Sequence, residues 1–163
     1  MTGGKIKLRG PLGLLALAGL ISTLTGCGQG TAQRAPDLRR LPLVDGARIV
    51  AQAQRCDRGA NAFCAVQLVI VNRRFRSSTD LLKGEHRLLL QSGWTGANGD
   101  TGEEHAADSP GHKLRVTYAT ADGDLKGIDL GWIKRPRQIT LALSRALFDR
   151  VPALSVMFEV GSS

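Results

Sequence analysis

The chain has little of several features on which common functions depend. Aromatic residues make up 4% of its 163 residues, with a single tyrosine, so side chains that could stack on nucleic-acid bases are scarce. It contains neither a G-x-S-x-G nucleophile elbow nor an H-E-x-x-H zinc motif. It also lacks an apolar run of about 20 residues, the length that crosses a bilayer as a helix. Nucleic-acid binding, these two hydrolase classes and a permanent transmembrane span are therefore not indicated.

A basic stretch followed by a short apolar run lies near the N-terminus. The first ten residues carry three bases and no acid, residues 11–23 are mostly apolar, and small residues precede Cys27. This order of charge, apolar core and small-residue site is typical of an export signal. We therefore predict that residues 1–26 are a signal peptide.

The sequence Leu24-Thr25-Gly26-Cys27 resembles the lipobox of bacterial lipoproteins. The resemblance implies that Cys27 becomes the first mature residue and carries two or three fatty chains such as palmitate. A single acyl chain binds a membrane only marginally, whereas two or more form a stable anchor. The excess of arginine over lysine, 16 to 6, favours a GC-rich and hence actinobacterial source. The rival interpretations are a spanning helix or an ordinary signal peptide that happens to contain a cysteine.

Removal of the signal would leave 137 residues in two parts. Residues 27–40 are polar and contain glycine, which predicts a flexible tether. Residues 41–163 are long enough to form one domain with its own core. The mature chain carries 19 Lys and Arg against 14 Asp and Glu. This positive charge suits an anionic lipid surface or serves solubility alone.

Two cysteines, Cys56 and Cys64, remain once Cys27 is assigned to lipid. Export would place them where disulfides persist, and the seven residues between them allow a turn. A redox pair fits less well because such pairs favour C-x-x-C. A zinc site needs more ligands at defined spacing. We therefore predict a structural disulfide between Cys56 and Cys64.

Alternation of apolar and polar residues divides the predicted domain into strands and helices. Strands are expected at residues 47–54, 64–72, 102–108, 113–120 and 154–160. The strand at 64–72 is almost continuously apolar, which is typical of a central strand buried on both faces. One helix is expected between an N-cap at Ser77 and a stop at Gly93. A second is expected from Pro136 to Leu147.

The order of these elements predicts an α+β domain with an antiparallel sheet and two helices on one face. From the second strand onward the order is ferredoxin-like, β-α-β-β-α-β, with an extra N-terminal strand. Asp122-Gly123-Asp124 predicts a turn. The organisation is similar to that of small actinobacterial lipoproteins of unknown function, with a cysteine pair, an apolar strand, a helix closing on Gly93-Trp94 and further sheet. This resemblance implies no activity.

One segment holds enough acidic and histidine side chains to suggest a metal site. Its candidate ligands are Glu103, Glu104, His105, Asp108 and His112. The six residues between the two histidines match no recognised ligand spacing, so a solvated polar loop is the preferred interpretation.

Other candidate positions favour structural roles. Residues 122–133 begin like a calcium loop but have Lys126 and Ile133 where oxygen ligands are needed. His86 is placed at the edge of an apolar helix face, as a surface or satisfied histidine. Trp94 and Trp132 are expected in the core, with a groove lining as the alternative.

Three functions remain open from the sequence. We favour a lipid-anchored, extracytoplasmic binding or interaction module without catalysis or cofactor, which contacts its ligand through an exposed sheet face or through residues 95–112. The alternative is a metal-assisted cell-envelope hydrolase that uses residues 103–112. The third is a structural or assembly lipoprotein with a stable envelope partner.

Overall fold

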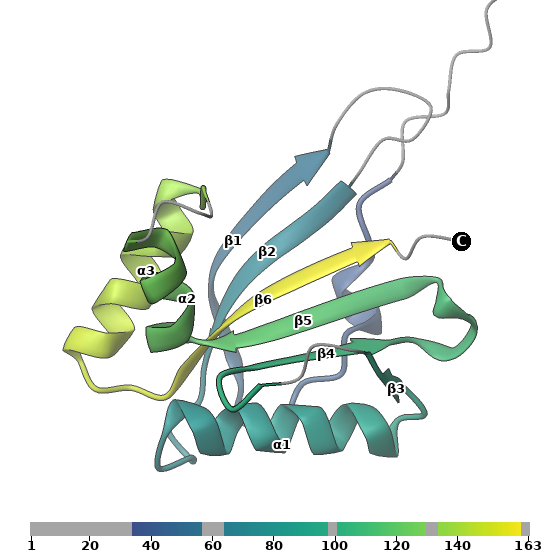
Figure 1. Ribbon diagram of the computed structural model, residues 1–163, viewed down its shortest axis with the longest axis horizontal. Helices are drawn as coiled ribbons and strands as arrows, with labels where there is room; N and C mark the ends of the chain where they lie inside the picture. The colour runs from purple at the N-terminus through teal and green to yellow at the C-terminus, as the bar shows by residue number, and fades with distance from the viewer. Residues whose placement is uncertain (1–33, 57–63, 98–100, 130–133, 161–163) are drawn as a thin grey trace, which may run out of the picture.

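The computed structural model describes residues 34–56, 64–97, 101–129 and 134–160. These residues form a six-stranded antiparallel sheet with the strand order β1-β2-β6-β5-β4-β3 (Figure 1). The strands are β1 (Arg48–Cys56), β2 (Cys64–Val71), β3 (Thr95–Gly96), β4 (Glu104–Asp108), β5 (Leu114–Thr120) and β6 (Ala153–Val160). The helices are α1 (Ser78–Gln91), α2 (Ala121–Asp129) and α3 (Arg137–Phe148), with short 3-10 turns at Leu38–Arg40 and Pro110–His112. An α+β class with an antiparallel sheet is confirmed.

Helix α1 packs against one face of the sheet through its apolar stripe. The Ser77 hydroxyl accepts the Asp80 N–H at 3.0 Å, as an N-cap does, and Gly93 follows the helix with a φ of +81°. Gly84 lies inside the helix, and a Cβ at this position would come within 2.8 Å of the Phe75 ring, so a larger residue would clash there. The fully buried leucines of the stripe are Leu81, Leu82 and Leu89. The predicted helix and both of its end signals are confirmed.

Helices α2 and α3 lie on the opposite face of the sheet. Ile139, Leu143 and Ala146 of α3 pack with Val69 and Val71 of β2. The neighbouring side chains on β2 belong to the core beneath α1: Val66, Leu68 and Ile70. Alternate residues of a strand point to opposite faces, so the apolar run of β2 serves both layers. The prediction of two helices on one face is wrong, whereas the prediction of a central strand buried on both faces is confirmed.

The strand order does not confirm the ferredoxin-like arrangement. A split β-α-β unit places another strand between the two strands that a helix connects. Here β5 and β6, which the α2–α3 segment connects, are adjacent and antiparallel. In addition, β6 rather than β2 pairs with β5, so β2 and β5 are separated by one strand. The agreement is therefore limited to the order of the predicted elements along the chain, to which the structure adds β3 and α2.

The prediction of a turn at Asp122-Gly123-Asp124 is wrong, because these residues form the first turn of α2. The Thr120 hydroxyl accepts the Gly123 N–H at 3.1 Å, which caps a helix start. The two acids in the first turn also suit the positive end of the helix dipole. A sequence that usually marks a turn is thus overridden by Thr120, the capping residue immediately before the helix.

Part of the segment assigned to the tether packs against the domain. Leu38–Arg40 forms a 3-10 turn that is capped by Asp37, whose carboxylate accepts the Arg39 N–H at 3.0 Å. Ala35 and Leu38 contact the core beneath α1, and Leu41 is buried in it. The predicted signal peptide and Cys27 lie outside the described residues. Among the described helices, none is long and apolar enough to cross a membrane.

Candidate functional site

The two cysteines of the folded part form the predicted disulfide. Cys56 ends β1 and Cys64 begins β2, and the two residues are partners in the antiparallel register with Cα atoms 4.0 Å apart. The bond joins the strands where the connection between them leaves and re-enters the sheet. It therefore has a structural place at the end of the β1–β2 hairpin.

The predicted acidic and histidine segment is not a loop but mainly strand β4. Because side chains alternate along a strand, His105 shares a face with buried Ala107, beneath α1, whereas Glu104 and Asp108 point to the other face. The His105 ring stacks on the His86 ring of α1, with centroids 4.4 Å apart. The candidate ligands of β4 are therefore divided between two sides of the sheet.

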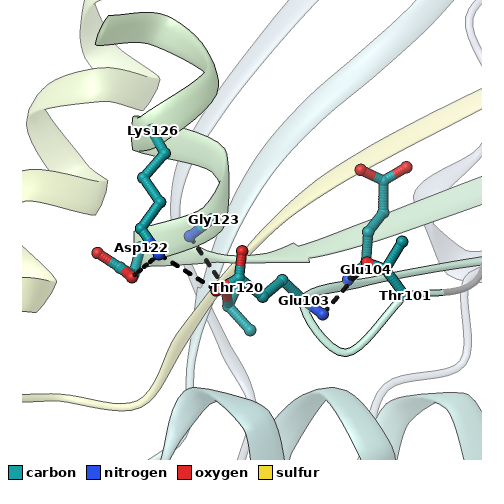
Figure 2. Close-up of polar contacts among 7 residues, drawn as sticks. All are labelled: Thr101, Glu103, Glu104, Thr120, Asp122, Gly123 and Lys126. Carbon is teal, nitrogen blue, oxygen red and sulfur yellow. Dashed lines mark hydrogen bonds and ion pairs between the residues drawn. The ribbon is translucent and has the colours of Figure 1, made fainter. Parts of the chain in front are cut away.

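The remaining two candidate ligands lie in different places: His112 is near the candidate Asp108, and Glu103 is near Lys126. His112 Nδ1 lies 3.8 Å from Asp108 Oδ2. Glu103 Oε1 lies 3.3 Å from Lys126 Nζ, which also approaches Asp122 Oδ2 at 2.8 Å (Figure 2). The contacts of Lys126 with Asp122 and Glu103 raise the pKa of Lys126, and the contact with Asp122 contributes most.

The contacts around Glu103 tie the start of β4 to α2. The Thr101 hydroxyl accepts the N–H groups of Glu103 and Glu104 at 3.2 and 3.0 Å, and Thr120 N donates to Glu103 O at 2.8 Å (Figure 2). In the part of the chain that the structure describes, no three His, Cys, Asp or Glu residues gather closely enough to hold a metal ion. Of the five candidate ligands, Asp108 and His112 lie near each other, and the structure does not gather a third beside them.

A buried ion pair fastens α2 to the segment before α3. Asp124 and Arg135 are paired, and their side chains are 2% and 11% exposed. The pKa of Asp124 is nevertheless raised, because burial outweighs the attraction of Arg135 and a hydrogen bond from Ser155. Breaking such a pair leaves a buried charge unpaired, so this contact has a structural role.

A second buried carboxyl was missed by sequence reasoning. Glu85 is a fully buried residue of α1, and its Oε2 accepts the Val44 N–H at 3.1 Å. Burial raises the pKa of Glu85 to about 7. Its spacing of four and three residues from Leu81 and Leu82 places it on the apolar stripe, and that signal could have revealed it. The contact holds the N-terminal segment against the domain.

Exposed apolar side chains gather on β1 and α3. Among the described residues, six large apolar side chains are exposed, and five of them belong to these two elements: Ile49, Val50, Leu141, Leu147 and Phe148. Phe148, at the end of α3, is 89% exposed, and Leu141 is 58% exposed. Scattered exposed leucines need no explanation, but a contiguous apolar patch marks an interaction site.

Three of these five side chains, Val50, Leu141 and Phe148, line a groove between β1 and α3. The hollow has a volume of about 1180 Å³, and we call it the β1–α3 groove. Small and β-branched residues form much of its lining: Ala51, Val71, Ala142, Ala146 and Val151. Val50, Leu141 and Phe148 contribute exposed apolar surface, and the Gln138 side chain donates to Gln52 O at 2.9 Å across the gap.

Charge at the β1–α3 groove is mostly positive. Three exposed arginines, Arg48, Arg73 and Arg145, line it together with one acid, Asp149. A smaller hollow of about 490 Å³ lies near the N-terminal end of α3, where Arg55, Lys134 and Arg135 are among its lining residues. Arg135 is neutralised by its pairing with Asp124, so the excess of positive charge is clearest at the β1–α3 groove, which is suited to anionic groups.

The groove is bordered by an edge of the sheet. Within the described residues, β1 pairs with β2 and with no other strand. The register between Ile49 and Ala51 is interrupted by a bulge. An edge strand presents backbone donors and acceptors that can pair with another chain, and bulges weaken that tendency locally.

The groove was not found from the sequence, although part of its signal was present. The spacing of Ile139, Leu143 and Ala146 marks the buried stripe of α3, and Leu141 and Phe148 fall off that stripe. Leu147, which the helical spacing placed on the apolar face, is 39% exposed. Periodicity identifies what a helix buries against its own sheet, but an exposed apolar residue beside it has no periodic signature.

The tryptophan prediction is confirmed at one of its two positions. Trp94 is buried in the core beneath α1, with its ring centroid 6.4 Å from that of Phe158. Trp132 lies outside the described residues.

Comparison with known proteins gives no match: no protein family, no curated protein and no solved structure is detectably similar to the chain.

Proposed function

We propose that the protein is a lipid-anchored, extracytoplasmic binding module, attached to a membrane through Cys27. The β1–α3 groove is its binding surface. The observation that carries this function is the concentration of exposed apolar side chains beside a hollow of about 1180 Å³. Binding sites are typically concave and largely apolar, with a few polar groups that fix orientation.

The anchor is supported by the order of basic, apolar and small residues before Cys27. Acyl chains on that thiol would hold the domain at the bilayer. We expect labelled fatty acid to be incorporated by the wild-type chain in a bacterial host and not by the Cys27→Ala variant. Mass spectrometry should show that the mature chain begins at residue 27. An unprocessed, unlabelled chain in the cytosolic fraction would contradict the anchor.

The binding surface is tested with two variants, each of which carries a photocrosslinking amino acid in place of one exposed leucine. In one variant the leucine lies in the groove, and in the other it lies away from the groove. Leu141 lines the groove and Leu90 lies on α1, with exposed fractions of 58% and 46%. We expect a discrete crosslinked product in the native host from position 141 and none from position 90. The product should disappear when Phe148→Ser is added. Equal products from both positions, or none from position 141, would overturn the assignment of the groove.

A further inference from the structure

We infer that the β1–α3 groove accepts an extended, acidic peptide segment, whose backbone lies along β1 and whose apolar side chains enter the hollow. The inference rests on the proposed function, since it names the chemistry of the ligand for the same surface. It is carried by three independent features: an edge strand, exposed apolar side chains beside a hollow, and an excess of positive charge.

The edge strand supplies the backbone part of the recognition. Addition of an extended peptide to an exposed sheet edge is a recurrent binding mode, in which main-chain hydrogen bonds provide affinity and side-chain pockets provide specificity. The described chain pairs β1 on one side, against β2. At the groove, the Gln52 carbonyl is held by the exposed Gln138 side chain, and a backbone N–H of the peptide can replace that donor. The bulge after Ile49 limits pairing near the start of the strand.

The apolar part of the recognition comes from both walls. Val50 on β1 and Leu141 and Phe148 on α3 are 45%, 58% and 89% exposed. Between them the lining is small, with Ala142 and Ala146 on α3. Alternate side chains of an extended peptide point to one side, so its apolar residues can fill the space above these alanines.

The charge of the lining selects the acidic class of peptide. Arg48, Arg73 and Arg145 are exposed, and Asp149 is the one acid among the described lining residues. Charge complementarity steers encounter and disfavours partners of like charge. A second copy of this chain fits poorly, because a two-fold pairing of the same surface would place two surfaces of net positive charge against each other. A flat lipid surface would leave the hollow unfilled.

The test is selection of a random octapeptide display library on the full-length chain in detergent. We expect enrichment of peptides with apolar residues at alternate positions and at least two Asp or Glu residues. Synthetic versions of the enriched peptides should bind the wild type and lose at least tenfold in affinity for Phe148→Ser and for Arg145→Glu. Leu90→Ser is the matched control and should bind as the wild type does. Both groove positions are exposed, and circular dichroism of each variant checks that it is folded.

Backbone pairing has its own readout. Amide chemical shifts of β1 should change when an enriched peptide is added. Those of β4, which lies near the opposite edge of the sheet, should not change. Enrichment of basic peptides, an absence of enrichment, or affinity that is unchanged by both groove variants would overturn the inference. Phe148-dependent dimerisation in sedimentation, or Phe148-dependent binding to anionic vesicles, would assign the groove to another occupant. If the crosslink at position 141 forms but no acidic peptide is selected, the inference fails while the proposed function stands.

Discussion

Glu85 shows how one side chain can couple stability to pH. Its carboxyl is fully buried and has one hydrogen-bond donor, the Val44 N–H. Burial disfavours the charged form, and the pKa rises from 4.5 to about 7. The folded state therefore binds more protons than the unfolded state between these values, and the free energy of unfolding falls as pH rises through this range.

We expect Glu85→Gln to remove this dependence. The amide keeps an oxygen that can accept the Val44 N–H but carries no charge at any pH. The variant should gain about 3 kcal/mol in free energy of unfolding relative to wild type between pH 4.5 and pH 8, from 1.36 kcal/mol per pKa unit. Urea unfolding at several pH values measures this change.

The matched control is Glu104→Gln, because Glu104 is an exposed carboxylate on β4. Its unfolding curves should shift little relative to wild type across the same pH range. If the free energies of unfolding of Glu85→Gln and wild type changed with pH in parallel, the burial of this carboxyl would not couple stability to pH.

At the scale of elements, the β1–β2 hairpin joins the candidate groove to the central strand of the sheet. Most of β1 is exposed, whereas β2 is buried along nearly its whole length. Strand β1 is thus held by its ladder with β2, by contacts with α3 and by the disulfide at its end. The groove depends on all three, because its floor and one wall belong to this hairpin.

Loss of the disulfide should therefore weaken β1 before it affects the rest of the fold. We expect the Cys56→Ser, Cys64→Ser double variant to lose roughly 2.5 kcal/mol of stability, since a bond that closes so short a loop restricts the unfolded chain by about that amount. Hydrogen exchange should accelerate at the Cys56 end of β1 and remain slow in β5.

Treatment of the wild type with a reductant should reproduce the behaviour of the double variant. Equal stability with and without reductant would contradict this structural role. The Cys27→Ala variant serves as the control, because it lacks a thiol outside the hairpin and keeps the disulfide.

At the scale of the whole molecule, one sheet separates two unequal layers. Helix α1 and the N-terminal segment cover one face, and α2 and α3 cover part of the other (Figure 1). Leu41 and Val44 contact the α1 layer, and α3 packs on the opposite face of the sheet. The N-terminal part of the described chain and helix α3 therefore belong to different faces of the domain.

Much of the secondary structure followed from the sequence, whereas the candidate site did not. The Ser77 cap, the alternation in β5 and β6 and the apolar run of β2 each depend on residues close together in the chain. The candidate metal ligands were also close together in sequence, but strand alternation places His105 on one face of β4 and Glu104 and Asp108 on the other. Proximity along the chain was a misleading guide there, because a strand separates its neighbours.

The sequence by itself determined most of the local elements, the α+β class and the cysteine pair, since capping, periodicity and a short turn act over a few residues. Strand β3 and helix α2 are the exceptions. Only the tertiary structure decided the strand order, the opposite placement of α1 and α3, the burial of Glu85 and the open groove. These features depend on which apolar faces meet, and the central strands offer apolar side chains on both faces. Packing between distant segments settled which face each helix covers and left the apolar side chains beside β1 uncovered.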